Sequence, residues 1–252
     1  MKAMQPVRFS NLKNLSLSPQ HYMHRVKHYD ELKSKSLTLG SAVHSMLLGG
    51  QETIVYPGAT RRGKEWDAFK AAHEGACIVS KGEQLQAIGM VNSLQRCKAA
   101  LELLKGEHEV ELAPWKINGR VCGGRVDVIG PRFITELKTA KSSQPHQFFR
   151  QARRMAYHCQ LAWYLDGNAA NGGTAVDAYI VAIESTPPYV VTPMMVTPRL
   201  LDIGRKMNRL WFELLLSCEG ENKWPGYVQD VIDFDCEDAE EDVELTFGDE
   251  ET

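Results

Sequence analysis

Residues 119–139 read GRVCGGRVDVIGPRFITELKT and contain two apolar-rich runs, 126–129 and 133–137, on either side of Gly130-Pro131. Two such runs separated by a glycine-proline pair predict a β-hairpin. A two-residue type I′ turn requires positive φ at both central positions, which Pro131 does not adopt. We therefore expect a four-residue loop, residues 130–133, that pairs Ile129 with Ile134.

This register places two carboxylates face to face. Asp127 lies directly opposite Glu136, and directly opposed side chains have Cβ atoms about 4.5–5.5 Å apart. Carboxylates at that distance repel each other unless a cation lies between them, and a hard divalent ion prefers such oxygen ligands. Lys138 shares the face of Glu136 because side chains alternate along a strand. The hairpin therefore predicts a metal site with a lysine beside it, which suggests hydrolysis.

The alternative interpretation is a surface hairpin whose charged side chains only face water. Two observations favour the metal site. Aspartate and glutamate are depleted in strands, yet Asp127 and Glu136 both occupy strand centres between apolar residues. The pair Gly123-Gly124 precedes Asp127, and glycine in a strand often marks the close approach of a backbone or a ligand.

Length and composition fit one soluble domain with a short appendage. The chain has 252 residues, of which 43% are hydrophobic and 24% charged. No run approaches the length of a membrane span, and the first ten residues contain no apolar signal core. The six cysteines are scattered without a CxxC pair, which predicts reduced thiols in a cytoplasmic protein and argues against zinc or an iron–sulfur cluster.

The charge is distributed unevenly along the chain. Residues 235–252 contain ten acidic residues and no basic one, and such a block is typical of a disordered tail. Residues 1–234, which we expect to form the single domain, contain 29 basic and 22 acidic residues, a net charge of +7. A basic domain of this kind is compatible with a phosphate-rich partner.

The remaining pattern predicts helices around a strand-rich centre. We expect a helical N-terminal part over residues 1–36, a helix at 38–48 that carries His44, and one helix over 145–166 ended by Gly167. Strands follow at 176–184 and 189–196, then a helix at 199–218 whose inward face comprises Ile203, Leu210, Leu214 and Leu215. The order predicts an α/β fold with a mixed central β-sheet flanked by helices. A lone histidine such as His44 is more often a core residue than a ligand.

Four short segments together resemble the PD-(D/E)xK nuclease superfamily, and within it the RecE and phage-lambda-type exonucleases. They are GSAVH (40–44), RVDVI (125–129), ELKT (136–139) and HCQLAWY (158–164), the last containing a QxxxY motif. The proline of the superfamily name is absent, since Val126 precedes Asp127. The resemblance implies a restriction-endonuclease-like core.

The resemblance also implies roles for individual residues. Asp127 and Glu136 would bind Mg²⁺ or Mn²⁺ with the Leu137 carbonyl and with His44 or Glu111, and Lys138 would orient or deprotonate the attacking water. Of two upstream carboxylates, Glu109 and Glu111, Glu111 is the preferred ligand. The implied substrate contacts come from Gln160 and Tyr164, which would steady the scissile strand, and from Arg125 or Ser41, which would hold a terminal phosphate.

The function implied is a Mg²⁺-dependent exonuclease that degrades one strand of linear double-stranded DNA, 5′ to 3′. Relatives of this type act beside a single-strand annealing protein in phage recombination, and the lambda type forms homo-oligomeric rings around DNA ends. One alternative is a RecB- or Cas4-type nuclease of other polarity. Another is a non-catalytic DNA-binding protein.

Overall fold

The computed structural model describes residues 5–28, 38–228 and 231–232. The acidic segment at 235–252 lies outside these residues, as does the stretch at 29–37. None of the helices in the described ranges combines the length and apolar character needed to cross a membrane.

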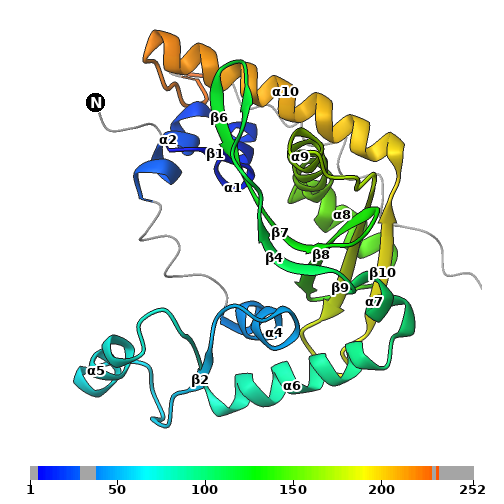
Figure 1. Cartoon of the computed structure of the whole chain (residues 1–252). Coiled ribbons are helices and arrows are strands. Elements are labelled where there is room, and N and C mark those ends of the chain that lie inside the picture. Colours follow the sequence, from blue (N-terminus) through cyan, green and yellow to red (C-terminus); the bar gives the residue numbers. More distant parts are fainter. Residues whose placement is uncertain (1–4, 29–37, 229–230, 233–252) are drawn as a thin grey trace, which may run out of the picture.

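A five-stranded sheet forms the centre of the molecule, in the order β10-β9-β8-β7-β4 (Figure 1). The strands are β4 (Glu107–Glu111), β7 (Arg125–Ile129), β8 (Phe133–Ala140), β9 (Asp177–Glu184) and β10 (Val191–Val196). Strands β8 and β9 are parallel, whereas the other neighbours pair antiparallel. The sheet is therefore mixed, as the sequence predicts.

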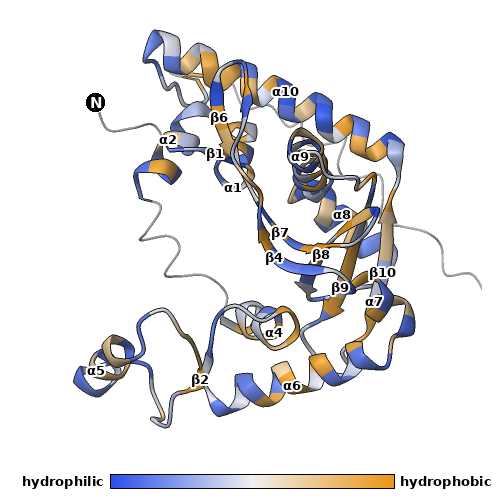
Figure 2. Ribbon diagram, viewed as in Figure 1, coloured by the Kyte–Doolittle hydropathy of each residue, from blue (hydrophilic) through white to orange (hydrophobic). Residues whose placement is uncertain are grey.

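Helices cover both faces of this sheet (Figure 1). One side carries α8 (Pro145–Arg154), α9 (Tyr157–Ala170) and α10 (Pro198–Glu221), and the other carries α4 (Thr38–Leu48), α6 (Lys81–Gln95) and α7 (Lys98–Leu103). Two apolar clusters result, one around Ile134, Leu161 and Phe212 and one around Leu137 and Met90. Figure 2 shows this layering as apolar strands beneath helices with polar outer faces. Burial of each large apolar side chain stabilises the fold by about 1.5–3 kcal/mol.

Smaller elements complete the fold. The N-terminal part contains β1 (Val7–Arg8), α1 (Phe9–Leu12), the 3₁₀ turn η1 (Lys13–Ser16) and α2 (Pro19–Lys27), which confirms the mainly helical character of its described residues, 5–28. Strand β1 joins β5 (Trp115–Ile117) and β6 (Arg120–Gly123) in a second sheet. Strands β2 (Thr53–Val55) and β3 (Cys77–Val79) form a parallel pair on either side of α5 (Lys64–Ala72).

The predicted hairpin is confirmed in its register. Ile129 pairs with Ile134 and Val128 with Thr135 across β7 and β8. The loop is closed by a hydrogen bond of 2.9 Å from the Gly130 amide to the Phe133 carbonyl. The rigid φ of proline excludes the tighter turn, so the loop length follows from local chemistry alone.

Two helix predictions are wrong in detail. The segment at 145–166 is two helices, because Ala156 adopts a left-handed φ of 55° between α8 and α9. Helix α9 then continues through Gly167 to Ala170. Gly167 serves packing rather than termination, since a Cβ there would lie 2.6 Å from the Trp115 ring.

The inward face of the closing helix also differs from the prediction. Helix α10 packs through Leu201, Gly204, Asn208, Trp211, Phe212, Leu215 and Cys218, all of them buried. Of the residues predicted to face inward, only Leu215 does so, and Leu210 is 64% exposed. The buried stripe includes a glycine and an asparagine, which a search for apolar residues passes over.

Candidate active site

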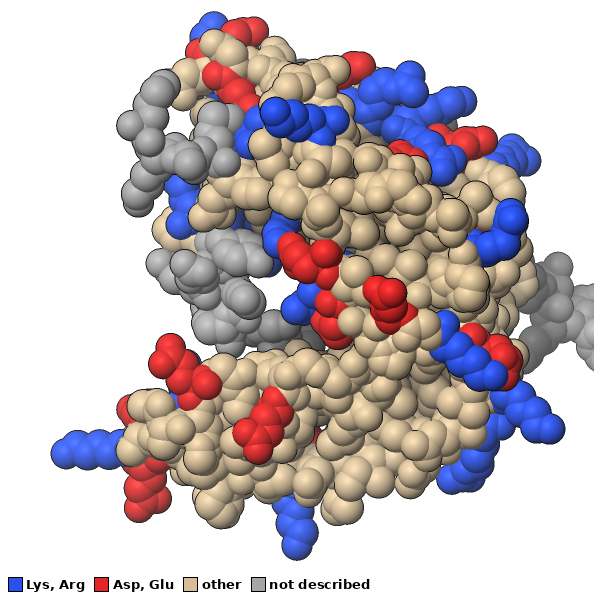
Figure 3. Space-filling model, in the orientation of Figure 1, with Lys and Arg blue, Asp and Glu red and all other residues tan. Residues whose placement is uncertain are grey.

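A cleft of about 1030 Å³ opens beside the hairpin, and its lining includes residues of β4, β7, β8, α4, η1 and the start of α9. Figure 3 shows the molecule hollowed here, with basic and acidic side chains both visible in the hollow. The predicted site residues that line this cleft are Ser41, His44, Arg125, Asp127, Leu137 and Lys138. Residues far apart in the sequence therefore meet at one place.

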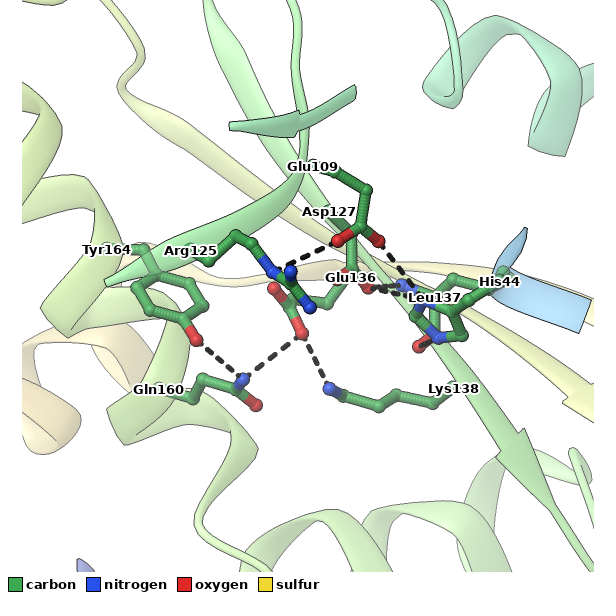
Figure 4. Close-up of polar contacts among 9 residues, drawn as sticks. All are labelled: His44, Glu109, Arg125, Asp127, Glu136, Leu137, Lys138, Gln160 and Tyr164. Carbon is green, nitrogen blue, oxygen red and sulfur yellow. Dashed lines mark hydrogen bonds and ion pairs between the residues drawn. The ribbon is translucent and has the colours of Figure 1, made fainter. Parts of the chain in front are cut away.

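Three side chains converge on the cleft as a possible cation site: His44, Glu109 and Asp127 (Figure 4). One ligand atom from each lies within 4.8 Å of the others. His44 Nδ1 is 3.8 Å from Glu109 Oε1 and 3.7 Å from Asp127 Oδ2. Two carboxylates and an imidazole provide oxygen and nitrogen ligands of the kind that divalent ions use.

Glu109, rather than the preferred Glu111, belongs to this cluster. Glu111 is exposed and forms an ion pair with Arg8 on β1. Both residues lie on β4, where alternation would give positions 109 and 111 the same face. Glu109 has a φ of 52°, however, which interrupts that alternation. The two glutamates consequently reach different partners.

The backbone of Glu109 is strained. In β4 the pairs on either side of it are His108 with Val128 and Val110 with Val126, so Glu109 lies opposite Asp127. A left-handed conformation costs a residue other than glycine about 1–2 kcal/mol. Such strain persists where surrounding structure imposes it and often occurs at functional sites. Here it accompanies the placement of a second carboxylate beside Asp127.

His44 is oriented by a backbone contact. Its Nε2 lies 3.0 Å from the carbonyl oxygen of Leu137, and a carbonyl only accepts, so Nε2 carries a proton. When neutral, the ring would therefore present the Nδ1 lone pair to a bound cation, as a metal ligand does. Burial opposes protonation of His44, but the nearby carboxylates of Glu109 and Asp127 outweigh burial and raise the pKa of His44 above its usual value.

Glu136 lies next to the cluster and is only 2% exposed. Its Oε2 accepts hydrogen bonds from Lys138 Nζ at 2.6 Å and Gln160 Nε2 at 3.2 Å. Its Oε1 has no hydrogen-bond partner among the described residues. Burial and the charge of Asp127 raise the pKa of Glu136 to about 7. A buried carboxylate oxygen without a donor is unfavourable, and a cation would satisfy it.

Asp127 is held by the neighbouring strand. Its Oδ2 accepts the Leu137 amide at 2.8 Å, just where the regular pairing of β7 with β8 has ended at Val128. The carboxylate thus accepts the hydrogen bond that a backbone carbonyl of β7 would accept in regular pairing, and this bond fixes the orientation of the Asp127 side chain. The same residue of β8 contributes its carbonyl to His44, so Leu137 positions two members of the cluster through its backbone.

Lys138 is a cation held between a carboxylate and an aromatic ring. Its Nζ lies 5.0 Å from the centroid of Tyr157 as well as 2.6 Å from Glu136. Burial opposes its charge, but Glu136 and Asp127 outweigh burial and raise the pKa of Lys138. An ammonium held in its charged form can donate hydrogen bonds and orient a ligand. It is a poor base for water.

Gln160 and Tyr164 lie on one face of α9, as their spacing predicts. Gln160 Nε2 is 3.1 Å from the Tyr164 hydroxyl and also reaches Glu136 (Figure 4). The QxxxY pair thus supports the buried carboxylate. Gly124 permits this arrangement, because a Cβ there would lie 2.9 Å from the Tyr164 ring. The close approach predicted at Gly123-Gly124 is therefore made by the Tyr164 ring against Gly124.

Arg125 and Ser41 both lie at the cleft, as described above. The side chain of Arg125 is 61% exposed, and its Nε lies 3.0 Å from Glu109 Oε2. Ser41 precedes His44 by one turn on α4. The sequence gives no indication of a further cleft residue, Lys13 of η1, because it is remote from every motif.

Comparison with known proteins agrees with this geometry. A family profile described as "PDDEXK-like domain of unknown function (DUF3799)" matches residues 8–238. No curated protein matches the chain. A crystal structure of a Eubacterium rectale protein, provisionally named an exonuclease, superposes with a TM-score of 0.63 at 15% identity, covering 96% of this chain and 94% of the other. A structure of SSO0001 superposes with a TM-score of 0.29 at 18% identity, covering 69% of this chain and 84% of the other, a similarity too low to indicate a shared fold.

Proposed function

Because this chain belongs to the family of PDDEXK-like domains of unknown function, we propose that it is a divalent-metal-dependent nuclease that hydrolyses phosphodiester bonds of DNA. The observation that carries the proposal is the convergence of His44, Glu109 and Asp127 beside Glu136, whose Oε1 lacks a partner among the described residues. These groups fit a hard divalent ion, Mg²⁺ or Mn²⁺.

The residues that would hold the ion are Asp127, Glu109 and Glu136, with His44 as a nitrogen ligand and the Leu137 carbonyl nearby. When bound, a divalent ion supplies electrostatic stabilisation of the charge that develops on a phosphate during hydrolysis. Its presence would also offset the cost of keeping several carboxylates together in a partly buried site. Among the metal ligands predicted from the sequence, only Glu111 does not belong to this group.

The protein's own groups would position the reactants. Lys138 points its ammonium at Glu136 and stays charged, so it would orient water or a phosphate oxygen rather than remove a proton. Gln160 holds Glu136 from α9 and also contacts the Tyr164 hydroxyl, and this pair would steady the scissile strand, as the resemblance implies. Arg125 has guanidinium donors beyond the Nε that contacts Glu109, and these donors, with Ser41, would bind a terminal phosphate.

We further propose that the enzyme is an exonuclease that degrades one strand of linear double-stranded DNA from the 5′ end. The resemblance to RecE and lambda-type exonucleases supports this polarity, action beside a single-strand annealing protein, and assembly into a homo-oligomeric ring. A RecB- or Cas4-type nuclease of other polarity is the nearest alternative. The scattered cysteines argue against the version with an iron–sulfur cluster.

The test uses linear and circular duplexes with Mg²⁺, with Asp127→Ala as the inactive control. We expect mononucleotides from linear DNA only, with the 5′ label lost first and with faster degradation of 5′-phosphate than 5′-hydroxyl ends. Prior loss of the 3′ label would contradict the polarity. Absence of any metal-dependent cleavage would leave a non-catalytic DNA-binding protein.

A further inference from the structure

Lys13 lines the cleft from a side that contributes no residue to the proposed metal site. It begins η1, between α1 and α2, whereas His44 and Ser41 reach the same cleft from α4. Figure 1 shows α1 and α2 well separated from α4. The side chain of Lys13 is half-buried, so its ammonium is partly removed from water.

Lys13 is distinguished from the other cations of the cleft because it has no counter-ion among the described residues. Arg125 and Lys138 also line the cleft, but Arg125 pairs with Glu109 and Lys138 with Glu136. No carboxylate among the described residues lies within ion-pair distance of Lys13. Burial, with the positive charges of Lys138 and Arg25, lowers the pKa of Lys13. A half-buried cation near other cations is unfavourable by itself and becomes favourable when an anion binds.

We propose that Lys13 forms a second phosphate-binding site in the cleft, which binds a backbone phosphate of the substrate strand near the phosphate held at the carboxylate cluster. This inference rests on the proposed nuclease function. A DNA strand carries one phosphate for about every 3.4 Å of helix axis, so a strand at the cluster has further phosphates within the same cleft. Lysine binds phosphate as a point charge, without the two-pronged geometry of arginine.

The two phosphate sites differ in their dependence on metal. Asp127 and Glu109 repel phosphate unless a cation lies between them and the ligand, whereas Lys13 attracts phosphate directly. The contribution of Lys13 to DNA affinity therefore persists in EDTA. This difference separates a phosphate contact at Lys13 from any indirect effect through the metal site.

The experiment compares wild type, Lys13→Ala and Lys13→Arg, with Lys206→Ala as the matched control, an exposed lysine on α10 outside the cleft. Binding to a labelled linear duplex is measured by fluorescence anisotropy in EDTA across a salt series. We expect Lys13→Ala to reduce the slope of log affinity against log salt by about 1, and Lys13→Arg and Lys206→Ala to leave it unchanged. Between 50 and 200 mM salt, wild type should then lose about three- to fourfold more affinity than Lys13→Ala.

Duplexes with a single neutral methylphosphonate locate the contact. One position should weaken wild-type binding and leave Lys13→Ala unaffected. If Lys13→Ala keeps the wild-type salt slope, or if no position distinguishes the two proteins, the inference is wrong, even where the wild type cleaves DNA with Mg²⁺. A wild type that neither binds nor cleaves DNA would refute the proposed function and this inference together.

Discussion

The strained backbone of Glu109 allows its structural and functional roles to be separated by substitution. Glu109→Gly and Glu109→Ala both remove the carboxylate and its contacts with His44 and Arg125. They differ in backbone preference, because the φ of 52° suits glycine and not alanine. The left-handed conformation costs alanine about 1–2 kcal/mol, while the greater freedom of unfolded glycine costs about 0.5–1 kcal/mol.

Glu109→Gly should therefore be more stable than Glu109→Ala by up to about 1.5 kcal/mol without metal. For a chain of this length each 1 kcal/mol of that difference raises the midpoint of thermal unfolding by about 2–4 °C. Glu111 is the control, since it lies on the same strand without a positive φ. There glycine should be less stable than alanine by about 0.5–1 kcal/mol, the opposite sign.

Metal binding gives the second measurement. Mn²⁺ at a hundred times the wild-type Kd stabilises the folded state by about 2.7 kcal/mol. If loss of a ligand weakens binding a hundredfold, the same Mn²⁺ concentration adds only about 0.4 kcal/mol. Both Glu109 variants should show this loss, and both Glu111 variants should keep the full shift. A Glu109→Ala more stable than Glu109→Gly would refute the strain argument, and an unchanged Mn²⁺ shift in either would refute the ligand assignment.

Three further predictions concern the buried pair and the tail. Lys138→Ala should lose most cleavage but keep Mn²⁺ affinity, whereas Glu136→Ala loses both; equal loss of Mn²⁺ binding in calorimetry would contradict this division. Without metal, the contribution of Glu136 to stability should fall as pH rises from 4.5 to about 7, because the folded state keeps the Glu136 proton that the unfolded state releases. In thermal unfolding over this pH range, Glu136→Gln should depend less on pH than the wild type. The same pH dependence in both proteins would show that Glu136 is not the cause. Deleting residues 236–252 should leave the unfolding temperature unchanged and tighten DNA binding more at 50 than at 200 mM salt, and equal affinities would exclude competition by the tail.

The features that the sequence determined by itself are local ones. The hairpin register follows from Gly130-Pro131 and from the two-residue period of strands, because both act over a few neighbouring residues. The shared face of Gln160 and Tyr164 follows in the same way from the helical period. These periods place Glu136 beside Lys138 and Gln160 beside Tyr164, whereas only the resemblance to the nuclease superfamily implied that the two pairs belong to one site.

Tertiary structure alone decided which other groups reach that site. The choice of Glu109 over Glu111 depends on a single positive φ, which no side-chain pattern encodes. His44 joins the cluster because α4 packs against β8. Lys13 lines the opposite side of the same cleft from η1, which packs against α2 and α10. The break at Ala156 likewise accompanies the packing of α8 and α9. Contacts between residues so distant in sequence depend on how whole helices and strands pack. Burial of their apolar faces stabilises one arrangement of the chain, and this stabilisation outweighs the local conformational preferences of individual residues.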